Sequence, residues 1–525
     1  VYYKTNNIYS LYLAKDYLVQ DDTILLESDL IFEDAVLKRL LDNPYPSLAL
    51  VAKFESWMDG TVVTLDEEDN IKSFLGKKDF VFEDIPNYYK TVNIYKFSKE
   101  FSSSHYVPFL EAYCKALGNN EYYEQVLKVI TLLDKPEIKA ERLDHEAWYE
   151  IDDVQDLNIA ESIFTSREEK FDKFNSRYGG YWRYPQLVDF CYLVNPFYPN
   201  RKLMDEIKAN FERLLCDYPS GMEINSLLGA KYYGLHKEQV CIGNGAAELI
   251  KSLMENLKGK IGMIYPTFEE YPHRKNKEDI IPFYAENKDF RYSADDLIQF
   301  YDSKDIQILV LINPDNPSGN YIEKADVLRL AEWAEKKDIR FIVDESFVDF
   351  ADVDDTPTLL QEDILERYDN LIIVESISKS FGVPGLRLGI LASNDLKLIS
   401  KMKKDVAIWN INSFAEFYLQ IFEKYKSNYE EALTKFKEVR SQFVRDLSTI
   451  RNLRVIPSQA NYLMCELTGE MTSRELAVIL LNDYNMLIKD LSTKNGFKGE
   501  SYIRVAVKRP EENLRLVQAI KNVLG

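Results

Sequence analysis

The stretch from Ser376 to Gly389 constrains this chain most, because it sets a lysine among small hydroxyl residues directly after a buried strand. The apolar run Leu371–Val374 precedes it, and Lys379 follows in Ser-Ile-Ser-Lys-Ser-Phe-Gly. A lysine that forms a Schiff base needs a largely dry pocket that lowers its pKa. The hydroxyls and Arg387 are donors of the kind that a phosphate group requires. Taken alone, the tetrapeptide also fits a surface lysine in a serine-rich loop, so the rest of the chain must decide.

The composition excludes several classes of function. The 525 residues carry a formal net charge of -21, which argues against nucleic acid as a partner because phosphate backbones attract basic surfaces. The five cysteines show no CxxC spacing, and four scattered histidines disfavour a histidine-based metal centre. No apolar run is long enough to span a bilayer and no secretory pattern opens the chain, so we expect a cytoplasmic protein without membrane contacts.

The second half, from about residue 175, alternates strands with helices, which favours a mostly parallel sheet covered on both faces. One strand runs through a glycine turn into a helix at Gly245-Ala246-Ala247, and small residues at a helix N-terminus let backbone amides approach an anion. Another strand leads to Phe268, which is either a platform for a flat ring or a core phenylalanine.

Three polar residues follow or lie on further strands of this half. Asn316 lies in a proline-fixed loop, where it could donate to a phenolate oxygen. Asp344 ends a buried strand, where a carboxylate can pair with a protonated pyridinium nitrogen. Arg504 lies in a late strand and is a suitable partner for a carboxylate, phosphate or phosphonate.

In order and context, these residues resemble fold-type I pyridoxal-phosphate enzymes, near the histidinol-phosphate aminotransferase and threonine-phosphate decarboxylase branch. The resemblance implies that Lys379 carries pyridoxal 5′-phosphate and acts as acid and base, while Asp344 pairs with the ring nitrogen. It assigns Asn316 to the ring hydroxyl, Phe268 to ring stacking and Arg504 to the substrate carboxylate. The residues that it places at the cofactor phosphate are Gly245, Ala246, Ala247, Ser376, Ser378, Arg387 and, from the second subunit of a homodimer, Tyr218.

The first segment offers two carboxylates near strand ends. Thr23–Phe32 is predicted as one buried strand that delivers Asp29 at its carboxyl edge, and Asp152 follows another predicted strand before a helix. Mg²⁺ takes one or two carboxylates together with phosphate oxygens and water. Helix caps or solvated strand ends are the alternative interpretation of both residues.

The strings Asn-Asn-Ile-Tyr-Ser-Leu, Lys-Thr-Val-Asn-Ile-Tyr-Lys-Phe-Ser and Tyr-Glu-Ile-Asp-Asp-Val resemble the phosphocholine cytidylyltransferase branch of the sugar-nucleotidyltransferase family. The resemblance implies that Asp29 and Asp152 bind Mg²⁺ against a CTP phosphate. It also places Trp57, Tyr149 and Glu150 near the ammonium end of the acceptor, although Trp57 would equally suit a core. The family's glycine-rich nucleotide loop does not occur, and we expect the sequence to begin inside this domain.

The predicted fold is therefore α/β throughout, with a domain boundary at a charged, glycine-containing segment. Residues 1–165 would form a Rossmann-like nucleotidyltransferase domain, 166–180 a linker, and 181–525 an aminotransferase-like domain whose small α+β subdomain covers about 425–525. In one respect the chain departs from many relatives, because Phe347 replaces a tyrosine that would bond the ring hydroxyl; the decarboxylase branch more often has phenylalanine there.

Linked domains often share a metabolite, and the architecture resembles 2-aminoethylphosphonate cytidylyltransferase–transaminase fusions. We expect transamination, from an amino-acid donor, to give 2-aminoethylphosphonate, which then receives CMP from CTP. The alternative is decarboxylation of phosphoserine followed by CDP-ethanolamine formation, or phosphocholine activation. A second alternative is a single pyridoxal-phosphate aminotransferase that carries a non-catalytic N-terminal binding module.

Overall fold

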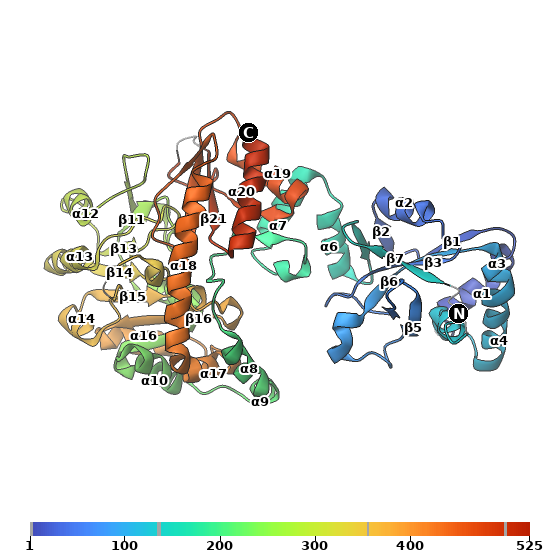
Figure 1. The fold of residues 1–525 in the computed structure, drawn as a ribbon. Coiled ribbons are helices and arrows are strands. Elements are labelled where there is room, and N and C mark those ends of the chain that lie inside the picture. The colour runs from blue at the N-terminus through green and yellow to red at the C-terminus, as the bar shows by residue number, and fades with distance from the viewer. Residues whose placement is uncertain (1–3, 134–137, 354–355, 498–500) are drawn as a thin grey trace. The chain divides into compact units, whose positions relative to one another are not determined.

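The computed structural model describes residues 4–133, 138–353, 356–497 and 501–525, which form two compact units, Val1–Pro185 and Gln186–Gly525 (Figure 1). The division lies after the linker expected at 166–180. Most of that segment is helix α7 (Arg167–Ser176), which packs against α6 (Val154–Ile163) of the first unit. Two buried side chains, Phe171 and Phe174, anchor α7 there, and the predicted linker is thus a folded part of the first unit.

The first unit is built around a six-stranded sheet in the order β5-β4-β6-β3-β7, with β1 also paired to β6. Its strands are β1 (Thr23–Leu26), β2 (Leu30–Phe32), β3 (Leu48–Lys53), β4 (Val62–Leu65), β5 (Ile71–Leu75), β6 (Tyr89–Phe97), β7 (Lys139–Leu143) and β8 (Trp148–Glu150). Its other helices are α1 (Asn7–Leu18), α2 (Asp34–Asp42), α3 (Lys99–Phe101), α4 (Val107–Leu117) and α5 (Glu124–Ile130). The side chain of Asn6 caps the N-terminus of α1.

The prediction of a single buried strand over Thr23–Phe32 is wrong. β1 pairs with β6, whereas β2 leaves that sheet and forms an antiparallel ribbon with β8. None of the residues of β1 and β2 is fully buried, and Asp29 lies in the turn between the two strands. An apolar run predicts extended backbone, but the partner of each stretch is set by tertiary pairing.

The second unit contains a seven-stranded sheet in the order β10-β16-β15-β14-β13-β11-β12, in which β16 is antiparallel to both neighbours. Its strands are β10 (Val240–Asn244), β11 (Ile261–Tyr265), β12 (Ile280–Tyr284), β13 (Ile308–Ile312), β14 (Arg340–Asp344), β15 (Leu371–Glu375) and β16 (Leu388–Ser393). The helices of this region are α8 (Arg201–Ala209), α9 (Phe211–Cys216), α10 (Met222–Tyr233), α11 (Ala246–Asn256), α12 (Ala294–Tyr301), α13 (Lys324–Lys336), α14 (Glu362–Arg367), α15 (Ile377–Ser380), α16 (Leu396–Asp405) and α17 (Ser413–Ile421).

The central strands are apolar along their length because helices cover both faces of the sheet. Alternate residues enter two different cores. Leu309 and Leu311 pack in one, while Ile308, Val310 and Ile312 pack in the other. This double burial fixes the register of the strands, and with it the positions of the residues at their carboxyl ends.

A smaller α+β part completes the second unit, with the four-stranded antiparallel sheet β17-β18-β21-β20. Its elements are α18 (Lys426–Leu447), β17 (Leu453–Val455), β18 (Tyr462–Leu467), α19 (Ser473–Tyr484), β20 (Lys489–Asp490), β21 (Ser501–Ala506) and α20 (Pro510–Leu524). The short β19 (Met486–Leu487) pairs with β9 (Val188–Asp189), which ties the start of the unit to this part. Figure 1 shows α18 and α20 running beside one another.

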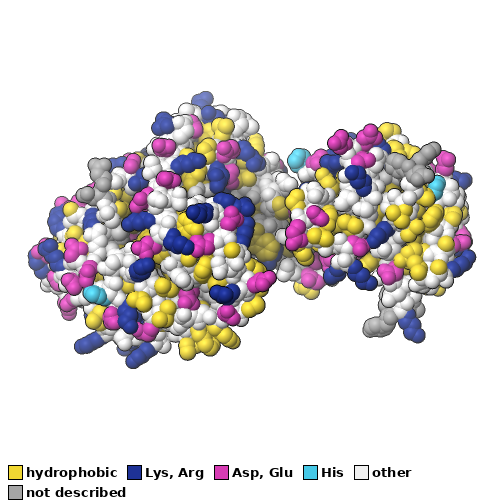
Figure 2. Space-filling view, turned by 60° about the horizontal axis from the view of Figure 1, so that its bottom comes forward, with side chains coloured by type: hydrophobic (Ala, Val, Ile, Leu, Met, Phe, Trp, Pro, Cys, Tyr) yellow, Lys and Arg dark blue, Asp and Glu magenta, His cyan; other side chains and the backbone are white. Residues whose placement is uncertain are grey.

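Acidic and basic side chains are interspersed over the surface that Figure 2 shows, as expected for a chain with both charge types and an acidic excess. No helix in the described ranges is long and apolar enough to cross a bilayer.

Candidate active site

The carboxyl ends of neighbouring parallel strands define the candidate site of the second unit. β14 ends at Asp344, and β15 leads through Ser376 into α15, which carries Lys379. Parallel strands present their carboxyl ends at one edge of a sheet, where ligands of such folds bind. Here they surround a pocket of about 210 Å³. Residues expected at the cofactor or substrate that line it are Ala246, Ala247, Phe268, Asn316, Asp344, Ser376, Lys379, Arg387 and Arg504.

Asp344 is fixed by two hydrogen bonds. Its Oδ1 accepts from the backbone N–H of Ser346 and its Oδ2 from the hydroxyl of Tyr271, each over 3.0 Å. Only 3% of Asp344 is exposed, and this burial raises the pKa of its carboxyl group. Tyr271, itself fully buried, was missed from the sequence, where it carries no signal beyond lying three residues after Phe268.

Lys379 lies where its ammonium is disfavoured. Burial, followed by the positive charges of Arg504 and Arg387, lowers the pKa of Lys379 to about 8. The carboxylate of Asp344 opposes this shift only in part. The lysine is thus much closer to its neutral, nucleophilic form near neutral pH than a solvated lysine would be.

The N-terminus of α11 and Arg387 form one wall of the pocket. Gly245 has a φ of +77°, and a Cβ atom at this position would collide with the Arg387 guanidinium, so only glycine fits. Ser376 lines the same pocket, but Ser378 does not. The Ser378 hydroxyl donates to the carbonyl of Leu388 and accepts from its N–H, which ties α15 to β16. Its contacts therefore give Ser378 a structural role rather than the expected phosphate contact.

Arg504 is held with part of its guanidinium group unused. Its Nη1 donates to Oδ1 of Asn316 over 2.7 Å, and its Nη2 donates to the carbonyl of Cys191 over 3.0 Å. Its Nε is buried and has no hydrogen-bond partner among the described residues. A buried, unpaired donor is costly, and this one can be satisfied by an anionic ligand in the pocket. Because Asn316 accepts through its oxygen, its amide nitrogen remains to donate to a ligand.

Three further wall residues, Cys191, Tyr192 and Leu193, come from the segment that follows β9. Their sequence shows no strand, glycine turn or charged motif that marks them, because tertiary packing alone brings them to the site. Tyr218 lies elsewhere: it is 80% exposed and stacks on Trp409 with ring centroids 4.6 Å apart, away from the pocket of its own chain.

In the first unit, the β2–β8 ribbon brings the two predicted metal ligands together. The backbone N–H of Ile151 donates to the carbonyl of Asp29 over 2.9 Å, so Asp152 follows a residue bonded to Asp29. Burial, followed by the charges of Asp156 and Asp29, raises the pKa of Asp152. Asp153, not Asp152, caps α6. Two adjacent carboxylates whose charges repel each other fit a divalent cation.

The residues expected at the acceptor's amine are arranged differently from the prediction. Trp57 and Tyr149 do lie together, stacked with centroids 4.3 Å apart. Glu150, however, points inward, where its Oε2 pairs with Lys90 and its Oε1 accepts from Asn93. Two other carboxylates lie beside the aromatic pair: Oε2 of Glu55 accepts from the indole N–H of Trp57 over 2.7 Å, and Oδ1 of Asp156 accepts from the hydroxyl of Tyr149 over 3.4 Å. We therefore correct the assignment of Glu150 as the amine receptor, since its charge is already paired in the interior.

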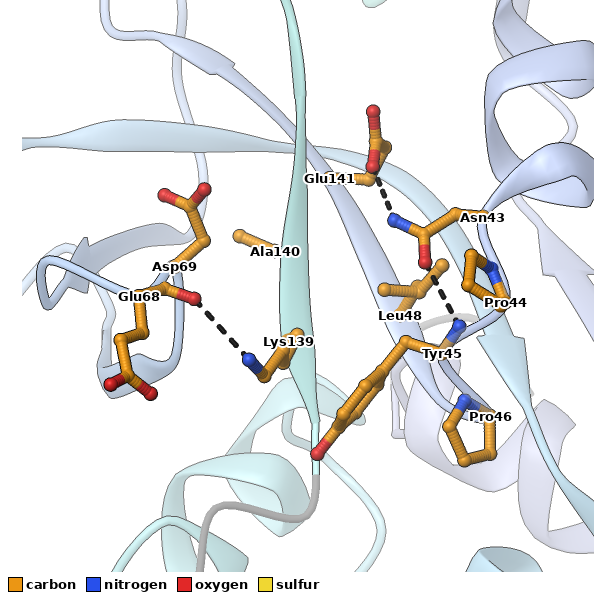
Figure 3. Close-up of a pocket in the computed structure, with 10 residues that line it drawn as sticks. All are labelled: Asn43, Pro44, Tyr45, Pro46, Leu48, Glu68, Asp69, Lys139, Ala140 and Glu141. Carbon is orange, nitrogen blue, oxygen red and sulfur yellow. Dashed lines mark hydrogen bonds between the residues drawn. The ribbon is translucent and has the colours of Figure 1, made fainter.

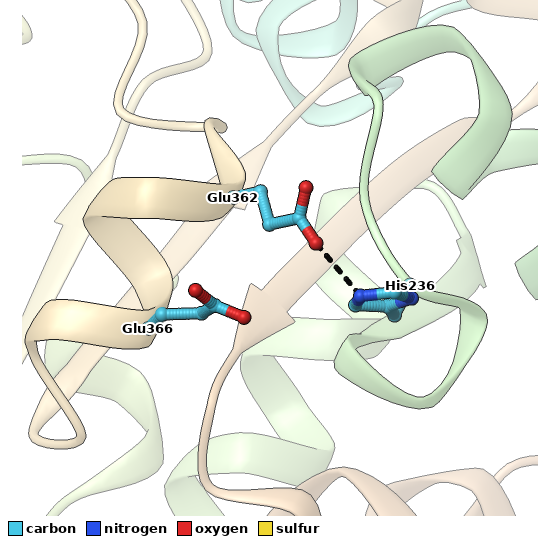
Figure 4. Close-up of side chains that lie close together, drawn as sticks. All are labelled: His236, Glu362 and Glu366. Atoms are coloured by element: carbon cyan, nitrogen blue, oxygen red, sulfur yellow. Dashed lines mark ion pairs between the residues drawn. The ribbon is translucent and has the colours of Figure 1, made fainter.

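Two other features of the described residues do not resemble active sites. The pocket in Figure 3 has Leu48 and Lys139 in its wall, which are the first residues of the parallel strands β3 and β7. It thus lies at the strand edge opposite to the one where α/β folds bind ligands. Figure 4 shows His236 with Glu362 and Glu366, whose ligand atoms would be close enough for a metal ion. Both ring nitrogens of His236 are engaged, one by the backbone N–H of Gln239 and one by Glu362, so this cluster is an exposed ion pair and helix cap.

Comparison with known proteins identifies the second unit. The family model for aminotransferase class I and II matches residues 223–520, more than half of the chain. The chain belongs to this family. Its second unit is accordingly a pyridoxal-phosphate-dependent enzyme of the aminotransferase fold, as the resemblance of Lys379 and its surroundings predicted.

Two relatives of this aminotransferase family member match different lengths of the chain. CMP-5′-(3-aminopropyl)phosphonate synthase from Streptomyces rubellomurinus is 30% identical over 522 residues, covering 99% of this chain and 82% of that protein. L-serine phosphate decarboxylase from Sulfurospirillum multivorans is 34% identical over 355 residues, 64% of this chain and 88% of the relative.

Two solved structures match about two thirds of the chain. A decarboxylase from Sulfurospirillum multivorans has a TM-score of 0.59 at 30% identity, covering 65% of this chain and 97% of its own. Histidinol-phosphate aminotransferase from Clostridium acetobutylicum has a TM-score of 0.57 at 26% identity, covering 64% and 99%.

The pocket of this family member fits the cofactor. Asp344 is held rigidly, Lys379 has a lowered pKa, and the amides of α11 face Arg387 across a position that only glycine can occupy. These features match three groups of pyridoxal phosphate: Asp344 suits the ring nitrogen, Lys379 the aldehyde, and the wall of α11 and Arg387 the phosphate.

Proposed function

We propose that the second unit decarboxylates an α-amino acid whose side chain ends in a phosphonate or phosphate, and that the first unit transfers CMP from CTP to that group. The observation that carries the proposal is the 30% identity, along 99% of this chain, to a synthase whose name contains both CMP and an aminoalkylphosphonate. The similarity of the second unit to L-serine phosphate decarboxylase supports the reaction type.

The pocket residues can divide the work of decarboxylation. Pyridoxal phosphate, when bound, supplies the electron sink that accepts the electron pair of the breaking bond. Arg504 would bind and orient the substrate carboxylate through its free Nε, so that the bond between Cα and the carboxylate carbon breaks and CO₂ leaves. Lys379 would return a proton to Cα, a task suited to an amine whose pKa is about 8.

Phe347 favours decarboxylation over the transamination that we expected from the sequence. It lines the pocket with its ring edge-on to Tyr462, at a centroid distance of 5.1 Å, and contributes no hydroxyl. Asn316 is then the expected donor to the ring hydroxyl. Transamination of phosphonoacetaldehyde with an amino-acid donor stays the competing reaction, since histidinol-phosphate aminotransferases share the fold.

The two reactions release different products, which gives the test. The purified chain with pyridoxal phosphate is incubated with phosphoserine and with the phosphono amino acid whose decarboxylation yields 3-aminopropylphosphonate, and CO₂ is measured. A parallel incubation with alanine and phosphonoacetaldehyde is assayed for pyruvate. CO₂ without pyruvate is the expected result, whereas pyruvate without CO₂ would make the second unit a transaminase.

The lowered pKa of Lys379 predicts how cofactor attachment depends on pH. Only the neutral amine attacks the aldehyde, so the attachment rate of pyridoxal phosphate to the cofactor-free protein should rise with pH and level off above about 8. For a solvated lysine, the attachment rate would keep rising with pH up to the usual lysine pKa of about 10.4. Stopped-flow absorbance at a series of pH values measures the profile, and a midpoint near that of free lysine would contradict the assigned environment.

For the first unit, Asp29 and Asp152 would bind Mg²⁺ against the CTP phosphates, and Trp57, Tyr149 and Glu55 would receive the acceptor's amine. The assay is pyrophosphate release from CTP with aminoethylphosphonate, aminopropylphosphonate, phosphoethanolamine or phosphocholine as acceptor. No release with any acceptor would instead favour a non-catalytic binding module.

An exposed apolar face of the second unit supports a homodimer. Leu215, Tyr218, Ile408 and Trp409 are each at least half exposed on one region near α9 and α17. A second copy is the occupant that we propose, because burying this face would also allow Tyr218 to reach the partner's cofactor phosphate.

A further inference from the structure

Two Glu-x-Asp segments of the first unit lie side by side. Glu27-Ser28-Asp29 follows β1, and Glu150-Ile151-Asp152 begins at the end of β8. In the β2–β8 ribbon Leu30 pairs with Glu150, and the N–H of Ile151 donates to the carbonyl of Asp29. Each segment therefore contributes one aspartate, the proposed metal ligand, and one glutamate two residues earlier.

The two glutamates are held from within by strand β6. Lys90, only 1% exposed, places its Nζ 3.1 Å from Oε2 of Glu150 and donates to the carbonyl of Thr91 over 2.8 Å. The amide nitrogen of Asn93 donates to Oε1 of Glu150 over 2.7 Å. Glu150 is thus bound through both oxygens by two side chains of the same strand.

Asn93 also binds the other segment. Its amide nitrogen donates to Oε2 of Glu27 over 3.3 Å, and its backbone carbonyl accepts from the N–H of Glu27 over 3.3 Å. The hydroxyl of Thr91 donates to the amide oxygen of Asn93, which fixes the orientation of the amide. Asn93 adopts a φ of +59°, a left-handed conformation that asparagine tolerates better than most residues. One amide therefore bridges both Glu-x-Asp segments.

The charges of this cluster are unequal. Of the four carboxylates of Glu27, Asp29, Glu150 and Asp152, only that of Glu150 forms an ion pair among the described residues, and its partner is Lys90. Because Lys90 is paired to Glu150, the aspartates keep a negative charge that a divalent cation can neutralise. Lys90 itself is too deeply buried to contact a bound nucleotide.

We infer that Lys90 and Asn93 are positioning residues for a divalent-cation site at Asp29 and Asp152, acting through Glu150 and Glu27. The inference rests on the proposed function of the first unit. Lys90 holds Glu150 in place, and Asn93 links Glu150 to Glu27. These contacts set the distance between Asp29 and Asp152. Partners that orient metal ligands in this way typically contribute tenfold or more to affinity.

The test measures Mn²⁺ binding by the full-length chain, from the loss of the free-Mn²⁺ electron paramagnetic resonance signal. Lys90→Met should weaken Mn²⁺ binding by about tenfold or more. The sign is diagnostic, because removing a positive charge near a cation site would by itself strengthen binding. Unchanged or tighter binding in Lys90→Met would overturn the inference.

Asn93→Gly provides a second variant that does not depend on the first. Glycine accepts the positive φ, so the backbone is retained while the bridging amide is lost, and weaker Mn²⁺ binding is again expected. Lys96→Met is the matched control from the same strand, since Lys96 bonds to the carbonyl of Asn43 instead; its affinity should equal that of the wild type. A double-mutant cycle of Lys90→Met with Glu150→Gln should be non-additive, because both changes remove the same contact.

Circular dichroism and the cofactor absorbance of the second unit verify folding of each variant. The assays also separate the two proposals. If the wild-type chain binds Mn²⁺ but releases no pyrophosphate from CTP, the proposed transferase function is wrong and the positioning inference stands. If the wild-type chain binds no Mn²⁺, the positioning inference is wrong.

Discussion

Replacing Lys379 by alanine should reduce turnover of the second unit by about 10³-fold or more and remove the visible absorption of the attached cofactor. In the proposed reaction Lys379, which lines the pocket, both attaches pyridoxal phosphate and moves the proton at Cα, and loss of a general acid or base alone costs about 10²- to 10⁴-fold. The measurements are CO₂ release and the absorption spectrum of the reconstituted protein.

Lys403→Ala is the matched control for this change. Lys403 is also a partly buried lysine with a lowered pKa, but its Nζ donates to the carbonyl of Lys237 and it does not line the pocket. Its turnover and absorption should stay close to those of the wild type. A Lys379→Ala protein that kept the absorption band, or turned over at the wild-type rate, would place the cofactor on another amine.

The sequence predicted the second unit well because its site lies at the ends of buried strands. Apolar runs such as Ile308–Ile312 are unambiguous when helices cover both faces, and the polar residue after each run then falls at one edge. Asp344, Ser376 and Lys379 were located in this way. Cys191, Tyr192 and Leu193 were not, since their segment has no periodicity and is held at the pocket by long-range contacts, among them the pairing of β9 with β19 and the bond from Arg504 to the carbonyl of Cys191.

The first unit shows where such reasoning stops. The run Thr23–Phe32 contains enough apolar residues for one strand, but it divides between two partners at the polar triplet Glu27-Ser28-Asp29, which the prediction had kept inside the strand. The direction of a carboxylate is also not readable from its position in a strand. Glu150 pairs with a lysine sixty residues earlier, so its interior role depended on the whole fold.

Ser378 illustrates the same limit at shorter range. It lies two residues from Ser376 in the motif, yet Ser376 lines the pocket, whereas the hydroxyl of Ser378 bonds the backbone of Leu388. On a helical turn, residues two apart point in different directions. A motif therefore identifies the segment that builds a site more reliably than it identifies each ligand.

Replacing Asp344 by asparagine should lower turnover by about 10²- to 10³-fold with little change in folding. Asparagine keeps the shape: its oxygen can accept from the N–H of Ser346, and its amide can donate to the hydroxyl of Tyr271. The substitution would remove the buried negative charge that, in the proposed site, pairs with the protonated ring nitrogen of the cofactor, and breaking a buried ion pair costs about 3–5 kcal/mol. The measurements are kcat for CO₂ release and the melting temperature.

Tyr271→Phe separates the charge of Asp344 from its orientation. This variant keeps the carboxylate and removes one of its two hydrogen bonds, so a smaller loss of roughly tenfold is expected, as for a single bond to a charged group. The combination of Tyr271→Phe with Asp344→Asn should cost little more than Asp344→Asn alone, because the tyrosine acts through the charge that is already gone. Additive losses in the double variant would mean that Tyr271 contributes to the site independently of Asp344.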